Sequence, residues 1–304
     1  MSFSGDAKSE LCRTALQRSC CAKAEAHGIL LFCNTFQKNM IRIVTENRAF
    51  AGRLPRLFHK AFGIAFDGVP DNLAGTAKLT FEITEPKKIE SIINTFGFSM
   101  EQTLSLHINF GLLEEDCCRV SFLRGVFLAG GSVTDPTKRY HMEFVTSHYK
   151  VSRELEALLM DMGFVSRETV RSGNFVTYFK QSEHIEDLLT LLGAPVAAME
   201  IMAAKVEKNL RNEMNRRVNC DTANVGKAVD AAQEQLAAIR ALERSGRLEE
   251  LPQKLQETAA QRRRYPEMTL GQLAASFDPP LTKSCLNHRL RKLIELARQE
   301  QQEA

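Results

Sequence analysis

The side chains best suited to chemistry form a cationic, amide-bearing set near the C-terminus. Residues 281–292 contain four Lys or Arg and no Asp or Glu. Arg can bridge O6 and N7 of guanine, and Asn can bridge N6 and N7 of adenine, when a helix presents them to the major groove of DNA. The pattern favours base recognition over the alternative, a solvated basic face on a small helical bundle. The candidate residues are Lys283, Ser284, Asn287, His288, Arg289, Arg291 and Lys292.

Three consecutive arginines, Arg262, Arg263 and Arg264, lie just upstream of this set. A run of guanidinium groups can neutralise DNA phosphates, which carry no sequence information of their own. We therefore expect these arginines, together with Lys283, to hold the DNA backbone while the last helix contacts base edges.

Local signals place these residues in a helix-turn-helix module at residues 247–304. Thr269 and Gln272 form a capping box that opens a short helix. Pro279 and Pro280 must end that helix, because neither can continue it. After this tight turn, Thr282 caps the last helix. The residues expected to face inward are Leu248, Leu251, Leu255 and Ala259 on a preceding helix, Leu270, Leu273, Ala274 and Phe277 on the short helix, and Leu286, Leu290, Leu293, Ile294 and Ala297 on the last.

The eight cysteines predict no metal site from their spacing along the chain. None forms a CxxC pair, and the N-terminal spacing C-x7-C-C-x11-C matches no common zinc pattern. We therefore expect free thiols, several of them buried like small hydrophobic residues, and neither a metal nor another cofactor. They are Cys12, Cys20, Cys21, Cys33, Cys117, Cys118, Cys220 and Cys285.

The first 195 residues contain an internal repeat, about 1–98 and 99–195. Apolar residues at i, i+3, i+4 and i+7 start at Ile89 and again at Ile185, 96 residues later, and a glycine follows each set. Gly28 and Gly125 lie 97 residues apart. Because two unrelated helices would not share these offsets, we favour duplication. Expected strands are 40–45, 79–83, 141–146 and 176–179, the last after a hairpin turn at 171–174, and expected helices include 47–62 and 149–162.

Residues 196–246 show no strand pattern and are expected to be a helical linker. Apolar residues from Val225 to Ile239 step by four and three over about two heptads. A coiled coil and a helix packed on its own domain both remain open. Residues 212–224 are rich in Asn and Arg, which favour caps and turns, contact phosphates or link domains by hydrogen bonds.

Size and charge set limits on the function. The chain has 304 residues, enough for two or three domains, and a net charge of only +3, so nucleic-acid affinity must come from local clusters. No apolar run reaches the roughly 18 residues of a membrane span, and the N-terminus does not resemble a signal peptide. We expect a cytoplasmic, nucleoid-associated protein with no membrane partner.

Two segments resemble the helix motif of LAGLIDADG homing endonucleases, at residues 26–34 and 122–132. The eighth position of that motif is an acidic residue that helps bind a catalytic divalent metal. Here the positions hold Cys33 and Gly130, which cannot supply the hard oxygen ligands that Mg²⁺ needs. The resemblance implies an α+β domain of two duplicated α/β halves with two mixed sheets. Gly28 and Gly125 would then lie where the two motif helices pack together.

Three segments in order resemble the WhiA family of bacterial sporulation and cell-division regulators. They are FLRGVFLAGGSVTDP at 122–136, NRRVNCDTAN at 215–224 and LTKSCLNHRLRKL at 281–293. The resemblance covers nearly the whole chain. It implies a degenerate LAGLIDADG-like domain (1–195), a linker and an all-α helix-turn-helix domain (247–304), with no catalytic residues. The implied partners are double-stranded DNA at promoter or operator regions and, as a further candidate, a sigma factor or another transcription regulator.

Two functions of other classes remain open on the sequence alone. The chain could be a metal-dependent endonuclease with relocated acids, for which Glu25, Asp116 and Asp135 lie nearest the motifs. Alternatively, the N-terminal domain could sense a ligand or a partner and pass the signal to the DNA-binding domain, since a fold does not fix a function.

Overall fold

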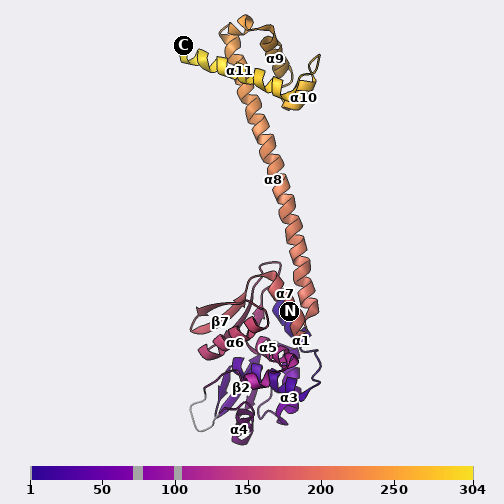
Figure 1. Ribbon diagram of the computed structural model, residues 1–304, viewed down its shortest axis with the longest axis vertical. Helices are drawn as coiled ribbons and strands as arrows, with labels where there is room; N and C mark the ends of the chain where they lie inside the picture. Colours follow the sequence, from indigo (N-terminus) through magenta and orange to yellow (C-terminus); the bar gives the residue numbers. More distant parts are fainter. Residues whose placement is uncertain (1, 71–77, 99–104, 304) are drawn as a thin grey trace. The chain divides into compact units, whose positions relative to one another are not determined.

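The computed structural model describes residues 2–70, 78–98 and 105–303, and the chain forms two compact units, Met1–Lys208 and Asn209–Ala304 (Figure 1). The first unit is α+β and the second is helical, which confirms the expected fold class. Among the described residues, no helix is both long enough and apolar enough to cross a membrane.

The first half of the α+β unit starts with a helix that the sequence patterns did not indicate, α1. The strands β2 and β3 have the bounds expected from their β-branched and aromatic residues. Asn47 accepts a hydrogen bond from the Phe50 amide at the start of α3, as an N-cap should. The elements are α1 (Phe3–Leu11), α2 (Ser19–Phe32), β1 (Thr35–Gln37), β2 (Met40–Thr45), α3 (Arg48–Phe62), β3 (Leu79–Ile83), α4 (Pro86–Thr95) and the 3₁₀ turn η1 (Phe110–Leu112).

The second half repeats this order and adds a hairpin strand. Ser172 and Gly173 both have positive φ, 50° and 79°, as the expected turn between β6 and β7 requires. The repeat predicted from the apolar spacing is therefore present as matching helices and strands. The elements are α5 (Asp116–Gly130), β4 (Gly131–Val133), β5 (Met142–Thr146), α6 (Tyr149–Asp161), β6 (Arg167–Arg171), β7 (Asn174–Phe179) and α7 (Ser182–Leu192).

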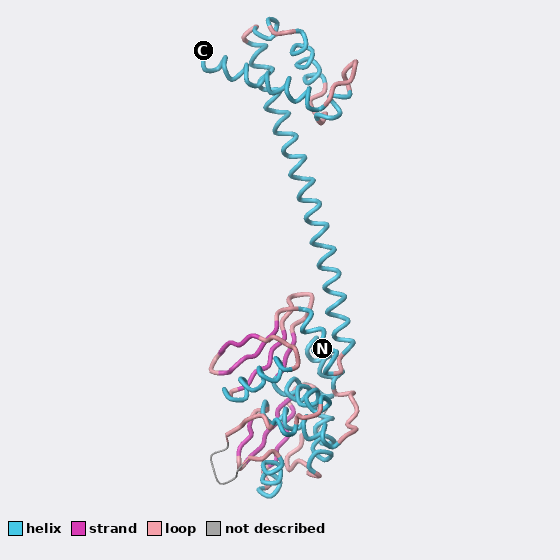
Figure 2. The backbone as a smooth tube through the Cα atoms, in the orientation of Figure 1, coloured by secondary structure: helices cyan, strands magenta, loops and turns pink. Residues whose placement is uncertain are grey.

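Two separate sheets result, with strand orders β1-β2-β3 and β4-β5-β7-β6 (Figure 2). Every described strand pair is antiparallel, so the expectation of mixed sheets was wrong. A helix between paired strands usually indicates a parallel crossover. After α3, however, Gly68 forms an antiparallel bridge with Glu82, so β3 runs back along this segment and does not follow directly from the helix.

The core of the α+β unit is centred on α2 and α5, which are apolar on nearly all sides. Residues 24–32 of α2 and 121–128 of α5 are all buried. A helix that is hydrophobic all round must be enclosed by other elements. The two motif helices are therefore the interior of this unit, and the two halves meet along them.

Helix α8 (Pro195–Arg244) is continuous and belongs to both units. It begins with Ala197, Ala198 and Ile201 in the core of the first unit and ends with Ala238, Ile239 and Leu242 in that of the second. The Asn/Arg-rich segment 212–224 is helical rather than turn-forming, because propensity is only a weak preference that long flanking helices override. In the heptad stripe, the last residues pack on the second unit while Val225 is exposed.

The second unit consists of the end of α8 and a helix-turn-helix arrangement around one small core. The expected long helix through Leu248 and Ala259 is split at Pro252 into a 3₁₀ turn and a helix. Buried residues of this core include Leu273, Leu286 and Leu290. The elements are η2 (Arg247–Glu250), α9 (Gln253–Arg264), α10 (Leu270–Ala275) and α11 (Lys283–Glu303).

Candidate nucleic-acid interface and degenerate motif site

The capping signals place α10 and α11 as expected. The Thr269 amide donates to Gln272 Oε1 at 3.1 Å, and the Gln272 amide donates to Thr269 Oγ1 at 3.4 Å, which completes the capping box. At the start of α11, the Cys285 amide donates to Thr282 Oγ1 at 3.2 Å. Both caps therefore fix where each helix begins.

The connection between α10 and α11 is longer than the tight turn expected, because residues 276–282 separate the helices. The two prolines in it exclude helix continuation. The segment is held by backbone contacts: the Leu281 amide donates to the Ala274 carbonyl at 2.9 Å. Gln261 Nε2 on α9 donates to the Ser276 carbonyl at 2.9 Å. These hydrogen bonds attach the connecting segment to α10 and the end of α10 to α9.

The inward face of α11 is the one predicted. Leu286, Leu290, Leu293 and Ala297 are buried, and Ile294 packs partly buried against the same core. These residues recur every three or four positions, so the opposite face of the helix must point to solvent.

The outward face of α11 carries most of the predicted DNA-contacting residues. Ser284, His288 and Arg291 are exposed at spacings of four and three, which places them on one stripe. Asn287 and Arg289 are half-buried at the sides of this stripe. The other two predicted residues, Lys283 and Lys292, are exposed.

Carboxylates mark the C-terminal limit of this polar stripe. Lys292 Nζ lies 2.9 Å from Glu295 Oε2. Arg291 lines a shallow hollow with Glu234 of α8 and Arg298, and Arg298 pairs with Glu234 at 2.7 Å. In the first turns of α11, the cations therefore have no acidic neighbours along the helix. In the last turns, acidic side chains lie beside the cations.

Arg262 is buried, which contradicts the exposed position that the predicted contact with DNA phosphates requires. It is 2% exposed, and its Nη1 donates to the Met268 carbonyl at 2.6 Å. Burial lowers the pKa of Arg262 below its usual value. The guanidinium ties the end of α9 to the loop before α10, a structural role. Consecutive arginines on a helix point about 100° apart, so all three could not share one face.

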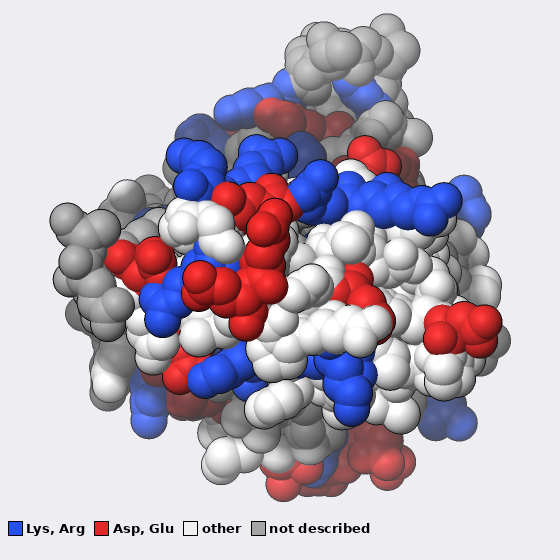
Figure 3. Space-filling view, turned by 90° about the horizontal axis from the view of Figure 1, so that it is seen from above, with Lys and Arg blue, Asp and Glu red and all other residues white. Residues whose placement is uncertain are grey.

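The other two arginines of the run, Arg263 and Arg264, are exposed, but each contacts a neighbouring side chain. Arg263 forms an ion pair with Glu243 of α8. The Arg264 guanidinium lies 5.4 Å from the centre of the Tyr265 ring. On the face drawn in Figure 3, Lys and Arg side chains lie beside Asp and Glu side chains. Recognition on this chain therefore depends on local geometry more than on overall charge.

Gly28 and Gly125 lie where the motif helices touch. A Cβ on Gly28 would be 2.2 Å from the Phe122 carbonyl oxygen, and a Cβ on Gly125 would be 2.1 Å from that of Glu25. Both distances are far inside van der Waals contact, so only glycine permits this approach. Both glycines therefore lie at the contact for which the sequence proposed them.

The two positions that carry acids in active homing endonucleases lie at the C-terminal ends of α2 and α5. Cys33 Sγ is within 3.2 Å of the Leu30 and Thr35 carbonyl oxygens, and burial raises the pKa of the Cys33 thiol to about 12. A Cβ on Gly130 would lie 2.7 Å from the Val145 carbonyl oxygen and 2.8 Å from a Phe32 ring carbon. The first position holds a neutral thiol, and the second has no room for a side chain.

The acids proposed for a relocated nuclease centre are dispersed. Glu25 is 1% exposed and accepts two hydrogen bonds from Arg53, at 2.6 and 2.8 Å, with Arg124 at 3.5 Å. Asp116 starts α5, at the opposite end from the motif position, and Asp135 accepts hydrogen bonds from Thr137 in the loop after β4. The structure does not bring these three carboxylates together.

A buried histidine in the first motif was not identified from the sequence. His27 Nε2 accepts a hydrogen bond from the Asn109 amide at 3.1 Å, and the ring packs 4.4 Å from Phe96, centre to centre. Burial, with a smaller contribution from His107, lowers the pKa of His27 to about 3. The imidazole is therefore neutral and acts as an acceptor for the chain entering α5. Its position among the apolar residues of the first motif was the feature of the sequence that could have predicted a buried histidine.

All eight cysteines are free, as expected, but four of them are not isolated. The pairs Cys20–Cys21 and Cys117–Cys118 come together at the starts of α2 and α5. Spacing along the chain could not show this, because the two pairs are brought together by the packing of two helices almost 100 residues apart.

Comparison with known proteins identifies relatives over the whole chain. Residues 119–211 match the model of the WhiA LAGLIDADG-like domain, and residues 214–297 match that of the WhiA C-terminal HTH domain. The chain is 36% identical to the "Probable cell division protein WhiA" of Alkaliphilus metalliredigens (strain QYMF), covering 99% of this chain and 98% of that protein. It is 37% identical to the protein of the same name from Ruminiclostridium cellulolyticum, covering 98% and 97%. The crystal structure of full-length DUF199/WhiA from Thermatoga maritima is similar in fold, with TM-score 0.59, 23% identity and coverage of 98% and 99%.

Proposed function

The chain belongs to the WhiA family, and from that premise we propose that it is a non-catalytic, sequence-specific DNA-binding protein. It regulates transcription, cell division and chromosome segregation and, where the organism forms spores, sporulation. Residues 247–304 contact the DNA, and residues 1–195 form the degenerate LAGLIDADG-like domain. Residues 196–246 link these two domains. The relatives' name supports the link to cell division.

The observation that carries the proposal is the outward face of α11. A capped helix, anchored by four buried residues, presents Ser284, His288 and Arg291 on one exposed stripe. Arg pairs with two acceptors of guanine, and Ser and His bond to base edges or phosphates, so this stripe has the donors that the major groove requires. Asn287, half-buried at the side of this stripe, has the amide that can pair with two atoms of adenine. We assign phosphate contacts to Lys283 and Arg264, which are both exposed.

Ion pairs on the two sheets favour a smaller contribution to DNA binding from the first unit than from α11. On the first sheet, Arg42 Nε is 2.7 Å from Glu82 Oε1. On the second, Arg171 Nη2 is 2.8 Å from Glu143 Oε1. Cations that are already paired within a sheet gain less from DNA phosphates than free ones. We therefore assign recognition to α11 and not to the sheets.

The lack of cleavage rests on the geometry at Cys33 and Gly130. A metal-dependent nuclease needs carboxylate oxygens converging on the scissile phosphate. A neutral thiol stands at one position, and the backbone of β5 and the Phe32 ring fill the space beside the other. A relocated centre built from Glu25 is disfavoured, since Arg53 already occupies both of its oxygens.

A genome-wide map of bound DNA tests the proposal. The full-length chain should enrich a defined set of promoter-proximal sites, and cells depleted of the protein should divide aberrantly. The double variant His288→Ala/Arg291→Ala should lose those sites. Lys60→Ala, which removes one exposed charge from α3, is the matched control and should keep them. Enrichment of the same sites by the α11 variant would refute the proposal, as would Mg²⁺- or Mn²⁺-dependent cutting of the bound sequences by the purified protein.

A further inference from the structure

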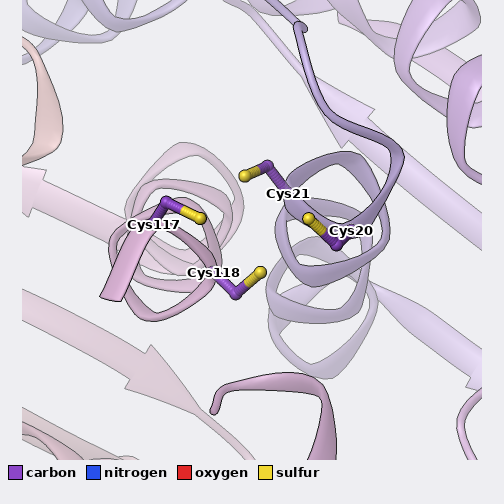
Figure 4. A group of neighbouring side chains, drawn as sticks. All are labelled: Cys20, Cys21, Cys117 and Cys118. Atoms are coloured by element: carbon purple, nitrogen blue, oxygen red, sulfur yellow. The ribbon is translucent and has the colours of Figure 1, made fainter. Parts of the chain in front are cut away.

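Two pairs of adjacent cysteines face each other across the starts of the motif helices. The Sγ atoms of Cys20, Cys21, Cys117 and Cys118 all lie within 4.8 Å of one another. The four sulfurs converge on the space between α2 and α5 (Figure 4). Among the described residues, no other group of His, Cys, Asp or Glu comes together as a candidate metal site.

The two pairs occupy equivalent places in the two halves of the repeat. Cys117 follows Cys20 by 97 residues, the same offset that relates Gly125 to Gly28. Each pair takes the second and third positions of its helix, since α2 starts at Ser19 and α5 at Asp116. The glycine contacts that hold the helices together therefore also fix the distance between the thiols.

The geometry matches a single metal ion with four sulfur ligands. Zn²⁺ binds thiolates at about 2.3 Å in a tetrahedron, which places the sulfurs roughly 3.8 Å apart. The observed limit of 4.8 Å lies slightly above that value, within reach of small side-chain rotations. An iron–sulfur cluster inserts several atoms between its cysteine sulfurs and needs a wider opening.

The surroundings suit the charge of such a site. A divalent ion with four thiolates carries two net negative charges. The N-terminal ends of α2 and α5 both present unpaired backbone amides and a partial positive charge. Arg18 adds a full positive charge, with Nη1 3.7 Å from Cys117 Sγ. Glu114, Glu115 and Asp116 precede Cys117 in the sequence, and their negative charges act against these positive contributions.

Access from solvent is also present. Cys118 is 2% exposed and buried at the inner side of the cluster, whereas Cys20 is exposed and the remaining two are half-buried. An ion can therefore enter from the side of Cys20 and finish in a largely enclosed position.

We propose that Cys20, Cys21, Cys117 and Cys118 form a four-thiolate site for a thiophilic divalent cation, with Zn²⁺ as the expected ion. Binding replaces four S–H bonds by four Zn–S bonds and releases four protons to solvent, with no change of oxidation state. The ion links the two halves of the LAGLIDADG-like unit at the end opposite Cys33 and Gly130. The bound ion stabilises the first unit, and metal binding does not depend on the presence of DNA.

Titration of the reduced, metal-depleted full-length chain with Co²⁺ tests this site. We expect one Co²⁺ per chain, a thiolate-to-cobalt charge-transfer band with the intense visible bands of a tetrahedral centre, and displacement by Zn²⁺. Zn²⁺ should raise the melting temperature of the first unit. Cys20→Ser and Cys117→Ser, neither of which disturbs a fully buried residue, should each weaken metal binding by more than about 100-fold, beyond the range for changes outside the ligand shell. Cys220→Ser, an exposed cysteine on α8, is the matched control and should bind as the wild type does.

Three outcomes would overturn the proposal. The first is the absence of a charge-transfer band in the wild type. The second is unchanged Co²⁺ binding in the double variant Cys20→Ser/Cys117→Ser, provided that its circular dichroism matches the wild type. The third is a protein whose four cysteines are isolated as two disulfides and that binds no metal once these disulfides are reduced.

Discussion

Replacing Gly125 by alanine gives a sharp test of the packed motif helices. The new Cβ would lie 2.1 Å from the Glu25 carbonyl oxygen and 3.1 Å from the Ile29 amide nitrogen, whereas ordinary contact begins near 3.4 Å. Both atoms belong to the backbone, so no side chain can rotate away. The helices must move apart by roughly 1 Å, which opens gaps along the rest of their interface.

The expected loss follows from two opposing effects. Overpacking of a tight core costs about 1–3 kcal/mol and sometimes more, while alanine favours a helix over glycine by up to about 1 kcal/mol. A net loss of about 2 kcal/mol lowers the melting temperature by roughly 4–8 °C in a domain of this size. Differential scanning calorimetry of the full-length chain measures it.

Gly52→Ala is the matched control for this substitution. Gly52 lies inside α3, and nothing is within 4 Å of a Cβ built there. The same chemical change should therefore raise the melting temperature slightly, through helix propensity alone. The double variant Gly28→Ala/Gly125→Ala should lose less than the sum of the single losses, because helices already separated by one methyl group admit the other. A Gly125→Ala melting temperature equal to that of Gly52→Ala would refute the close contact.

Three further predictions concern buried and exposed charges. Arg53→Met should cost about 3 kcal/mol in the free energy of unfolding, the lower end of the range for breaking a buried pair, because Glu25 keeps only the more distant Arg124, at 3.5 Å; an unchanged denaturant midpoint would contradict this. Since the pKa of His27 falls from 6.5 to about 3 on folding, the unfolded state alone takes up this proton below pH 6.5, so stability should drop by about 2 kcal/mol from pH 7 to pH 5. His27→Gln should show a smaller drop, and parallel pH profiles would count against the assignment. Arg263→Ala and Arg264→Ala should each reduce the salt dependence of DNA binding by up to about 0.9 in log–log slope, whereas Arg262→Ala should lower the melting temperature of the second unit. A change of slope without loss of stability in Arg262→Ala would show that Arg262 contacts a phosphate instead.

Much of the fold was predictable because local and global signals agree. The strands at 40–45 and 79–83 have β-branched and aromatic residues, and the capping box at Thr269 has both of its partners within three residues. The close approach at Gly28 and Gly125 followed from the repeat offset and the missing side chains. Helix α1 carries only a weak apolar face and gave no comparable pattern.

The parts that failed depend on contacts between distant segments. Arg262 looks like its two neighbours in the sequence, and only the loop before α10, folded over its guanidinium, makes it structural. The antiparallel order of the sheets depends on a chain reversal after α3, which a helix between two strands does not indicate. The four cysteines come together through helix packing and not through local spacing.

A competition titration most directly tests the claim that α11 reads DNA sequence. Labelled DNA from a mapped site is titrated with the full-length chain and displaced by unlabelled specific or scrambled DNA at two salt concentrations. We expect a preference of at least about 10³-fold for the specific sequence. Arg291→Ala should lose about 1–3 kcal/mol at that site and relax the preference. Equal affinity for both sequences, or full specificity after Asn287 and Arg291 are both changed to alanine, would contradict recognition by this helix.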